Sequence, residues 1–331
     1  MKKCFSILAF ICLMSNSYGQ NDTTCLMPDD AMIDKAILSL WSGSCFVLDS
    51  NRLHSLNIIQ CAANHLSHTQ YNNYLRAENS DGEKETGILR FYQQAFEKIV
   101  REIKTETPSN GTIMMWYLYN MGYIIKTPTC CFAIDIKHKN SKRLVDLIDF
   151  LLITHRHNDH FDNEIVEQMN LLGKPVVSNF IDNNYLVTQP KTMTIGEVEI
   201  KILINDHNSR TPNFVLSYEI DCGKSTDHMI IFHTGDSYMA SQLQTSNEID
   251  IFIPHLRVGL NINDVVKKTH AKNVLMSHVL ELAHSRVEGG YRWSYDNGFH
   301  ECNQLTNTNC YLPVWGEKTI WTKKSLTTIK N

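Results

Sequence analysis

Apolar residues recur every three or four positions through the first third of the chain, which is the period of an amphipathic helix. The clearest repeat covers residues 83–104 and predicts one long helix. Asp29 and Asp30 precede an earlier repeat, and acidic residues are typical of a helix start. A break at residues 107–111, with a proline and a glycine, ends this pattern. We therefore predict a helical N-terminal region.

Beyond the break, short runs rich in β-branched and aromatic residues predict strands. Residues 112–119 and 123–127 form a predicted hairpin, and residues 163–172 a predicted helix. Strands mixed with helices indicate a layered α+β fold in which helices lie outside a sheet core. We predict two regions, a helical one over 20–108 and a layered domain over 109–331.

The first 19 residues have the pattern of a secretory signal peptide. Lys2 and Lys3 give a positive start, an apolar run extends from Cys4 to Met14, and small and polar residues lead to Gly19. The apolar run is too short for a permanent membrane span. Its cysteines lack the small preceding residue of a lipoprotein site, so a lipid anchor is not favoured. We expect cleavage near Gly19 and export to the periplasm or the medium.

Charge and cysteine content narrow the class of protein. The 331-residue chain has a formal net charge of −4 and no basic run, whereas a nucleic-acid-binding surface is normally positive. We therefore expect a small-molecule substrate and no nucleic-acid partner. Cysteines of an exported protein can form disulfides. We favour a Cys302–Cys310 pair first, and then one pair among Cys25, Cys45 and Cys61.

The densest group of candidate metal ligands directly follows the apolar run 147–153. It contains three imidazoles and a carboxylate within six residues: His155, His157, Asp159 and His160. Imidazole with carboxylate suits zinc, iron or manganese. The first two histidines fall on the same side of an extended chain, and a turn would bring the other two residues round. Burying all four without partners would be costly, so we interpret them as metal ligands rather than as ordinary loop residues.

Three further apolar runs end in residues of the same chemical kind. The run 198–204 leads to His207, the run 230–234 leads through Gly235 to Asp236, and the run 274–277 leads to His278. Each candidate therefore lies where a strand gives way to a loop, a common position for binding residues. The separate runs predict a single site with ligands from distant parts of the chain.

This order of ligands resembles that of the metallo-β-lactamase superfamily. The resemblance covers about residues 110–325 and implies an αββα sandwich, with two sheets between layers of helices. It implies two sets of ligands, one for each of two ions: His155, His157 and His207, then Asp159, His160 and His278. It further implies that Asp236 bridges the ions, and that Asp135 lies beneath them and orients a ligand.

The resemblance implies an enzyme, a metal-dependent hydrolase. Two neighbouring divalent ions would activate a shared hydroxide for attack on a carbonyl or phosphoryl centre. Asp159 and Asp236 are the candidate catalytic residues. Zn²⁺ is the first choice of ion, with Mn²⁺ and Fe²⁺ as alternatives, because nitrogen and oxygen ligands suit all three. The expected substrate is a small ester, lactone, amide or phosphodiester.

The bridging aspartate and the short spacing narrow the branch of the family. Penicillin-cleaving members generally lack this aspartate, and only 42 residues separate Asp236 from His278. These features resemble the ascorbate-6-phosphate lactonase-like hydrolases. Two alternatives keep the same fold, namely a non-catalytic, metal-stabilised binding protein and a mono-iron oxygenase. The seven filled ligand positions disfavour the first alternative, and export argues against the second.

The run 278–284 has two interpretations. If it is helical, Glu281 and His284 lie on the same face as His278, where they contact substrate or donate a proton. Otherwise these two residues form a surface salt bridge. The sequence favours neither interpretation.

Overall fold

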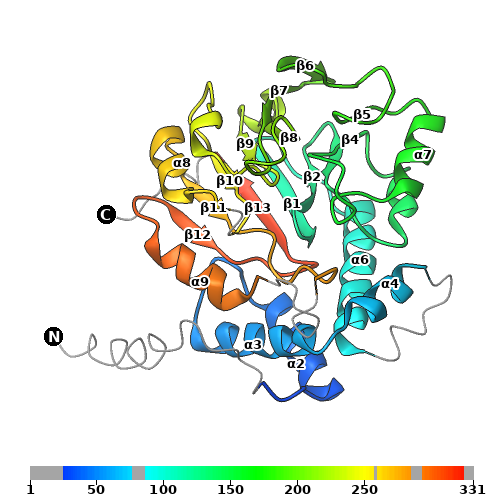
Figure 1. Ribbon diagram of the computed structural model, residues 1–331, viewed down its shortest axis with the longest axis vertical. Coiled ribbons are helices and arrows are strands. Elements are labelled where there is room, and N and C mark those ends of the chain that lie inside the picture. Colours follow the sequence, from blue (N-terminus) through cyan, green and yellow to red (C-terminus); the bar gives the residue numbers. More distant parts are fainter. Residues whose placement is uncertain (1–24, 77–85, 257–258, 285–292, 324–331) are drawn as a thin grey trace.

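Two β-sheets form the centre of the molecule, with helices on both outer sides (Figure 1). The computed structural model describes residues 25–76, 86–256, 259–284 and 293–323. The expected signal peptide lies outside these residues. The arrangement confirms the predicted αββα sandwich with helices ahead of it. Within the described residues, no helix has both the length and the hydropathy needed to cross a membrane.

Helices account for the chain from residue 30 to the first strand, in the part that the structure describes. They are α2 (Asp30–Ser42), α3 (Ser50–Asn64), α4 (His68–Arg76) and α6 (Gly87–Thr105). Asp29 and Asp49 accept hydrogen bonds from backbone N–H groups at the starts of α2 and α3, which satisfies amides that have no partner within the helix. The predicted long helix is α6, whose apolar face is buried and contacts the first strand. The domain boundaries at 19 and 108 stay predictions.

The first sheet has the strand order β13-β1-β2-β3-β4-β5. Its members are β1 (Thr112–Tyr119), β2 (Gly122–Lys126), β3 (Cys131–Ile134), β4 (Phe150–Leu152), β5 (Val176–Val177) and β13 (Lys318–Thr322). β1 and β2 form the predicted hairpin, and β3 and β4 run parallel. Gly122 is required in this hairpin, because a Cβ there would lie 2.5 Å from the carbonyl oxygen of Asp135.

The second sheet has the order β12-β11-β10-β9-β8-β7-β6. Its members are β6 (Lys191–Ile195), β7 (Val198–Asn205), β8 (Val215–Asp221), β9 (Ile230–His233), β10 (Ile251–Ile253), β11 (Asn273–Leu275) and β12 (Asn309–Tyr311). β9, β10 and β11 are parallel, so their carboxyl ends meet at one edge. β7 runs antiparallel to β8, which runs antiparallel to β9, so β7 also ends at that edge.

The outer layers contain the remaining helices. These are α7 (Asn163–Leu171), α8 (Ile262–Thr269) and α9 (Tyr295–Gln304), with short 3-10 turns η1 (Ser141–Leu144), η2 (Lys224–Thr226) and η3 (Ala240–Gln242). In Figure 1, α6 and α7 flank the sheet of β1 to β5, and α8 and α9 flank the sheet of β9 to β12. The helix expected over 163–172 is present as α7. Neither α9 nor β10 and β13 were expected, because they are short or have few apolar positions.

Both disulfide predictions are confirmed. Cys302 pairs with Cys310, and Cys25 pairs with Cys61. The first bridge ties the end of α9 to β12, and the second ties the start of the described chain to α3.

A buried ion pair joins the N-terminal helices to the sandwich. Arg52 on α3 and Glu317, next to β13, are each only 6% exposed, and the guanidinium donates to both carboxylate oxygens at 2.7 and 2.8 Å. A third Arg52 hydrogen bond reaches the carbonyl of Leu312, and Val314 N–H donates to Glu317. The helices therefore pack on the sandwich through a contact whose charges are matched.

Candidate metal centre

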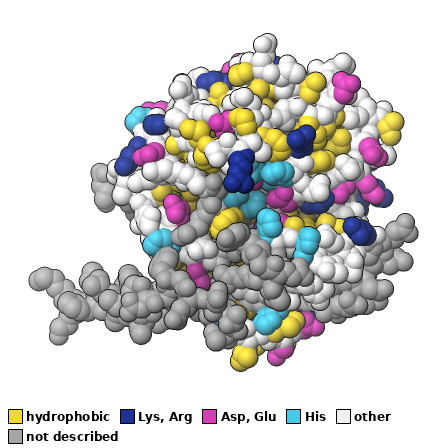
Figure 2. Space-filling view, in the orientation of Figure 1, with side chains coloured by type: hydrophobic (Ala, Val, Ile, Leu, Met, Phe, Trp, Pro, Cys, Tyr) yellow, Lys and Arg dark blue, Asp and Glu magenta, His cyan; other side chains and the backbone are white. Residues whose placement is uncertain are grey.

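The seven predicted ligands converge on one edge of the sandwich. Loops that follow the carboxyl ends of four strands contribute them: β4 leads to His155, His157, Asp159 and His160, β7 to His207, β9 to Asp236, and β11 to His278. Figure 2 shows histidine side chains gathered near the middle of one face, beside acidic ones. Strand ends from both sheets meet there, which explains how residues more than a hundred positions apart become neighbours.

A first group of donor atoms forms around two imidazoles from the β4 loop. The ligand atoms of His155, His157, His207 and Asp236 all lie within 4.8 Å of one another. His155 Nε2 is 3.0 Å from His157 Nδ1, and His207 Nε2 is 3.4 Å from Asp236 Oδ2. Donors bound to one ion at about 2.1 Å are about 3–4 Å apart, so these spacings suit a shared cation. The Phe214 ring covers this group on one side.

A second group lies next to the first. It consists of Asp159, His160 and His278, whose ligand atoms also lie within 4.8 Å of one another. Asp159 Oδ2 is 3.4 Å from His160 Nε2 and 3.2 Å from His278 Nε2. The His160 side chain is fully buried, whereas that of Asp159 is 18% exposed. The three residues therefore form a half-open site with one side toward solvent.

Asp236 lies between the two groups. Its Oδ2 atom faces His207 Nε2 at 3.4 Å, and its Oδ1 atom faces His160 Nε2 at 3.3 Å. The preceding Gly235 has φ +53°, and a Cβ there would lie 2.7 Å from the Thr154 side chain. Only glycine permits this close approach without strain. The Gly-Asp pair of the sequence is thus what lets the carboxylate reach both groups.

Asp135 supports the site from beneath, as the resemblance implies. Its carboxylate accepts hydrogen bonds from Thr154 N–H and from Thr154 Oγ1, at 2.8 and 2.7 Å. It also lies 2.8 Å from His160 Nδ1. Burial alone would lower the pKa of His160, but Asp236, Asp159 and Asp135 raise it well above its ordinary value, so Nε2 holds a proton that a bound cation would displace. Since an ionised carboxylate only accepts, Nδ1 also carries a proton, and Nε2 is turned toward the site. This is the usual orientation of a metal-binding histidine.

The donor atoms fit divalent cations. His160 Nε2 and Asp236 Oδ1 are buried, face each other at 3.3 Å and have no hydrogen-bond partner among the described residues. Buried polar atoms without partners cost free energy, and a cation bound between them removes that cost. Nitrogen and oxygen donors of this kind suit zinc, manganese and iron.

The protonation states also favour a cation. Burial lowers the pKa of His155, and the neighbouring His160 lowers it further, so the imidazole is neutral and free to bind a metal. Burial alone would raise the pKa of Asp236, but His160, His255 and His155 hold it well below its ordinary value. Burial alone would likewise raise the pKa of Asp159, but His160 and His278 lower it. Both carboxylates are therefore ionised.

Two residues near the site were not among the predicted ligands. Asn120, in the β1–β2 turn, donates from Nδ2 to Asp159 Oδ2 at 3.1 Å, and its carbonyl accepts from His278 N–H at 2.7 Å. No sequence signal marks this residue, because it lies in an ordinary hairpin turn. His255 follows β10 and lies against Asp236 and His278. The sequence does mark His255, because this residue follows a short apolar run as the predicted ligands do.

The helical interpretation of residues 278–284 is wrong. Positive φ angles at His278 and Leu280 break any helix there. Glu281 is fully buried and accepts hydrogen bonds from the backbone N–H groups of Ala283 and His284. It also pairs with the His284 imidazole. The carboxylate therefore stabilises its own loop, and the pair forms a salt bridge with a buried acid rather than a surface one.

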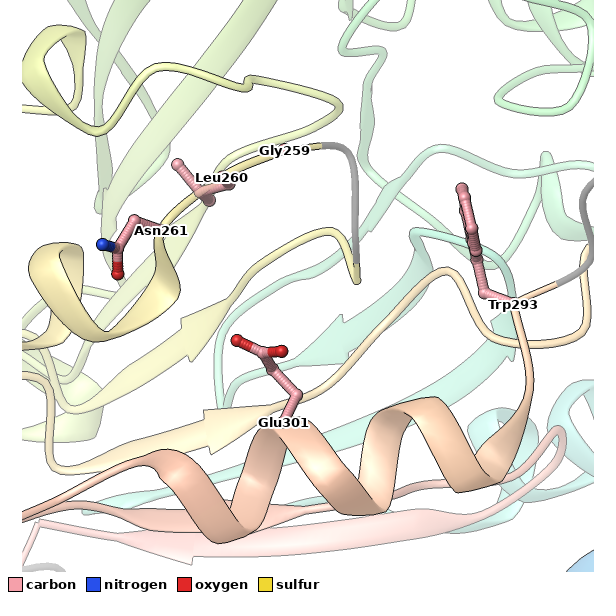
Figure 3. A pocket seen from close by; sticks show the side chains of 5 residues that line it. All are labelled: Gly259, Leu260, Asn261, Trp293 and Glu301. Carbon is pink, nitrogen blue, oxygen red and sulfur yellow. The ribbon is translucent and has the colours of Figure 1, made fainter. Parts of the chain in front are cut away.

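A hollow of about 400 Å³ lies beyond the loops that follow the site (Figure 3). It is lined by Gly259, Leu260, Asn261, Trp293 and Glu301, and by none of the seven predicted ligands. Leu280 N–H donates to the Trp293 carbonyl at 2.8 Å, so the loop after His278 is tied to one wall of the hollow.

A family match agrees with this geometry. Residues 107–288, more than half of the chain, match the family described as Beta-lactamase superfamily domain. The chain belongs to that superfamily, and the predicted resemblance is confirmed. Together with the clustered His and Asp side chains, the match confirms an enzyme of the metal-dependent hydrolase type. The ascorbate-6-phosphate lactonase-like branch stays a prediction.

Solved structures of the same fold are similar at low identity. The metallo-beta-lactamase fold protein YhfI from Bacillus subtilis has a TM-score of 0.48 and 13% identity, over 64% of this chain and 100% of its own. Igni18, a metallo hydrolase from Ignicoccus hospitalis, has a TM-score of 0.48 and 12% identity, over 63% of this chain and 98% of its own. The diiron beta-hydroxylase CmlA from Streptomyces venezuelae has a TM-score of 0.46 and 13% identity, over 78% of this chain and 63% of its own. No curated protein matches the chain.

Proposed function

We propose that this protein is an exported, dinuclear metal-dependent hydrolase that acts on a small ester, lactone, amide or phosphodiester. The observation that carries the dinuclear assignment is the position of Asp236. One of its oxygens faces His207 at 3.4 Å and the other faces His160 at 3.3 Å, so a single carboxylate serves both ligand groups. A mononuclear site would use one group and leave the other as unpaired buried donors.

Each ligand group has a defined part in this proposal. His155, His157 and His207 would hold one ion, and Asp159, His160 and His278 the other. When bound, a pair of divalent ions supplies a hydroxide at neutral pH and polarises the substrate oxygen. Asp135 and Thr154 keep His160 in the metal-binding tautomer, because the carboxylate accepts the Nδ1 proton. Asp159 is also a candidate proton acceptor, since its carboxylate is ionised and reaches solvent.

The substrate class follows from the donor set and the spacing rather than from a shaped pocket. A metal-held hydroxide needs no serine or cysteine nucleophile, and it attacks carbonyl or phosphoryl centres. The bridging aspartate and the short interval to His278 support the lactonase-like branch. Export is supported by the signal-peptide pattern of the first 19 residues. Zn²⁺ is the proposed ion, with Mn²⁺ and Fe²⁺ as alternatives.

Metal analysis followed by a substrate panel tests the proposal. The purified protein should contain two divalent ions per chain and should turn over at least one member of a panel of lactones, phosphodiesters and β-lactams. Chelation should abolish the turnover, and Zn²⁺ or Mn²⁺ should restore it. One iron per chain with oxygen-dependent activity would favour the oxygenase. Bound metal without turnover of any panel member would favour the binding protein.

A further inference from the structure

His255 lies between two of the predicted ligands. It follows β10, directly after Pro254, and pairs with Ser277 in a parallel bridge. β10 is the central member of the parallel trio β9, β10 and β11, whose outer members lead to Asp236 and His278. His255 is only 3% exposed. The topology therefore places a buried imidazole at the same edge as the metal centre.

The imidazole of His255 points at the other ligands. Its Nε2 atom is 3.7 Å from Asp236 Oδ2, which is beyond hydrogen-bond distance. Its ring stacks on that of His278, with centroids 4.0 Å apart and planes 28° apart. The ligand atoms of Asp236, His255 and His278 all lie within 4.8 Å of one another. The same spacing relates the ligands within the two groups already described.

A structural histidine from the neighbouring strand shows a different pattern. His233 is also fully buried, but its Nε2 lies 2.9 Å from the Met121 carbonyl and its Nδ1 accepts from Gly235 N–H at 3.2 Å. Both of its ring nitrogens are thus paired. The Nδ1 atom of His255, by contrast, is buried without a hydrogen-bond partner among the described residues. Packing alone gives no reason to keep an imidazole there, because an apolar ring would fill the space without that cost.

We propose that His255 is an eighth protein ligand of the metal centre and binds the second ion together with Asp236 and His278. This inference rests on the proposed dinuclear site. It gives the second ion three imidazoles, from His160, His255 and His278, and two carboxylates. The first ion keeps three imidazoles and the shared carboxylate. The second site is therefore the more fully coordinated one, and it should hold its ion more tightly.

Metal titration of the purified full-length protein tests this assignment without using activity. Co²⁺ is added to metal-free protein and followed by its visible absorption, and Zn²⁺ affinity is measured against a chromophoric chelator. The variants are His255→Ala and His255→Phe, where phenylalanine keeps a stacking ring but offers no donor atom. His228→Ala is the matched control, because that imidazole is 63% exposed and lies outside the site. Unfolding curves of all metal-free proteins control for folding.

We expect the wild type and His228→Ala to bind two ions, the second-site ion more tightly. Both His255 variants should bind that ion at least about 100-fold more weakly, since even indirect support of a ligand is worth 10–100-fold. If His255→Phe binds two ions as tightly as the wild type, His255 is a packing residue and the inference is overturned. If the wild type binds fewer than two ions, the dinuclear proposal itself fails, which is a separate outcome.

Discussion

Two buried clusters of ionisable side chains in this molecule differ in how their charges are balanced. In the Arg52–Glu317 cluster, a guanidinium and a carboxylate face each other and form two hydrogen bonds, and backbone groups of Leu312 and Val314 add one more to each side chain. At the metal centre, an imidazole nitrogen and a carboxylate oxygen face each other without a completed hydrogen bond. His160 Nε2 meets Asp236 Oδ1, and neither has a hydrogen-bond partner among the described residues.

The comparison separates a structural cluster from a functional one. A buried charge pair is tolerated when its members neutralise each other and their hydrogen bonds are made. At the metal centre, the carboxylates raise the pKa of His160 and His278 against the effect of burial, so protons balance the negative charge where a bound cation would otherwise do so. The first cluster therefore joins the N-terminal helices to the sandwich, whereas the second needs something from outside the chain. Substitutions in each cluster should have different consequences for stability and for metal binding.

The largest effect is expected from Asp236→Ala. This change removes the carboxylate that serves both ligand groups, so hydrolysis should fall to background and the bound metal to at most one ion per chain. The fold should persist, because a buried charge is removed rather than introduced. Turnover on the active panel substrate, metal content and far-UV circular dichroism measure the three quantities. Unchanged turnover in this variant would rule out the assigned role.

Glu317→Ala should destabilise the protein strongly without touching the metal site. It leaves the Arg52 guanidinium buried and unpaired, which typically costs about 3–5 kcal/mol of unfolding free energy. The double variant Arg52→Met/Glu317→Leu should lose much less, because neither charge remains. Urea unfolding measures both, and metal stoichiometry should stay at the wild-type value. Equal losses in the single and double variants would contradict this account of the pair.

A smaller effect is expected from Asn120→Ala. The side chain holds Asp159 in place, and loss of such support typically weakens metal binding by about 10–100-fold. The second ion should be affected and the first ion spared, since Asn120 touches neither His155 nor His207. Chelator competition resolves the two ions, and Asn120→Asp provides the comparison in which a like charge meets Asp159. A uniform loss of both ions would point to misfolding instead.

The smallest effect is expected on the pH dependence of stability, through His138, which is buried against the N-terminal helix α6. Burial holds the pKa of His138 well below its ordinary value, with Lys139 and Arg143 adding to the shift. The ring stacks on Phe96 of α6 at 4.0 Å. The unfolded chain takes up this proton near pH 6.5 and the folded state only at lower pH, so stability falls as pH drops below about 6.5.

Urea unfolding of metal-free protein at pH 7.5 and 5.5 checks this prediction. The wild type should lose about 1 kcal/mol more than His138→Gln over that interval, because the variant has no imidazole to protonate. The difference between the two proteins isolates His138 from the metal-centre histidines, which titrate in both. An identical pH dependence would show that His138 does not contribute.

Particular elements show how far the chain alone leads. The long apolar repeat predicted α6, and the runs that end in His or Gly-Asp marked four strand-to-loop junctions. Two elements were not predicted. β10 has only three residues, and α9 buries few apolar side chains, so neither shows a recognisable apolar period. His255 was overlooked for the same reason, since its strand was not recognised as one.

The chain by itself determined the chemistry of the ligands, their order and the strands that carry them, because local periodicity and residue type are properties of neighbouring positions. It could not determine that Asn120 supports Asp159, that Glu281 accepts hydrogen bonds from the backbone of its own loop, or that His255 lies against His278. Those contacts depend on which strand ends meet at one edge of the sandwich. The pairing of strands in each sheet decides which strand ends become neighbours. That pairing joins residues far apart in the chain, so only the tertiary structure specifies these contacts.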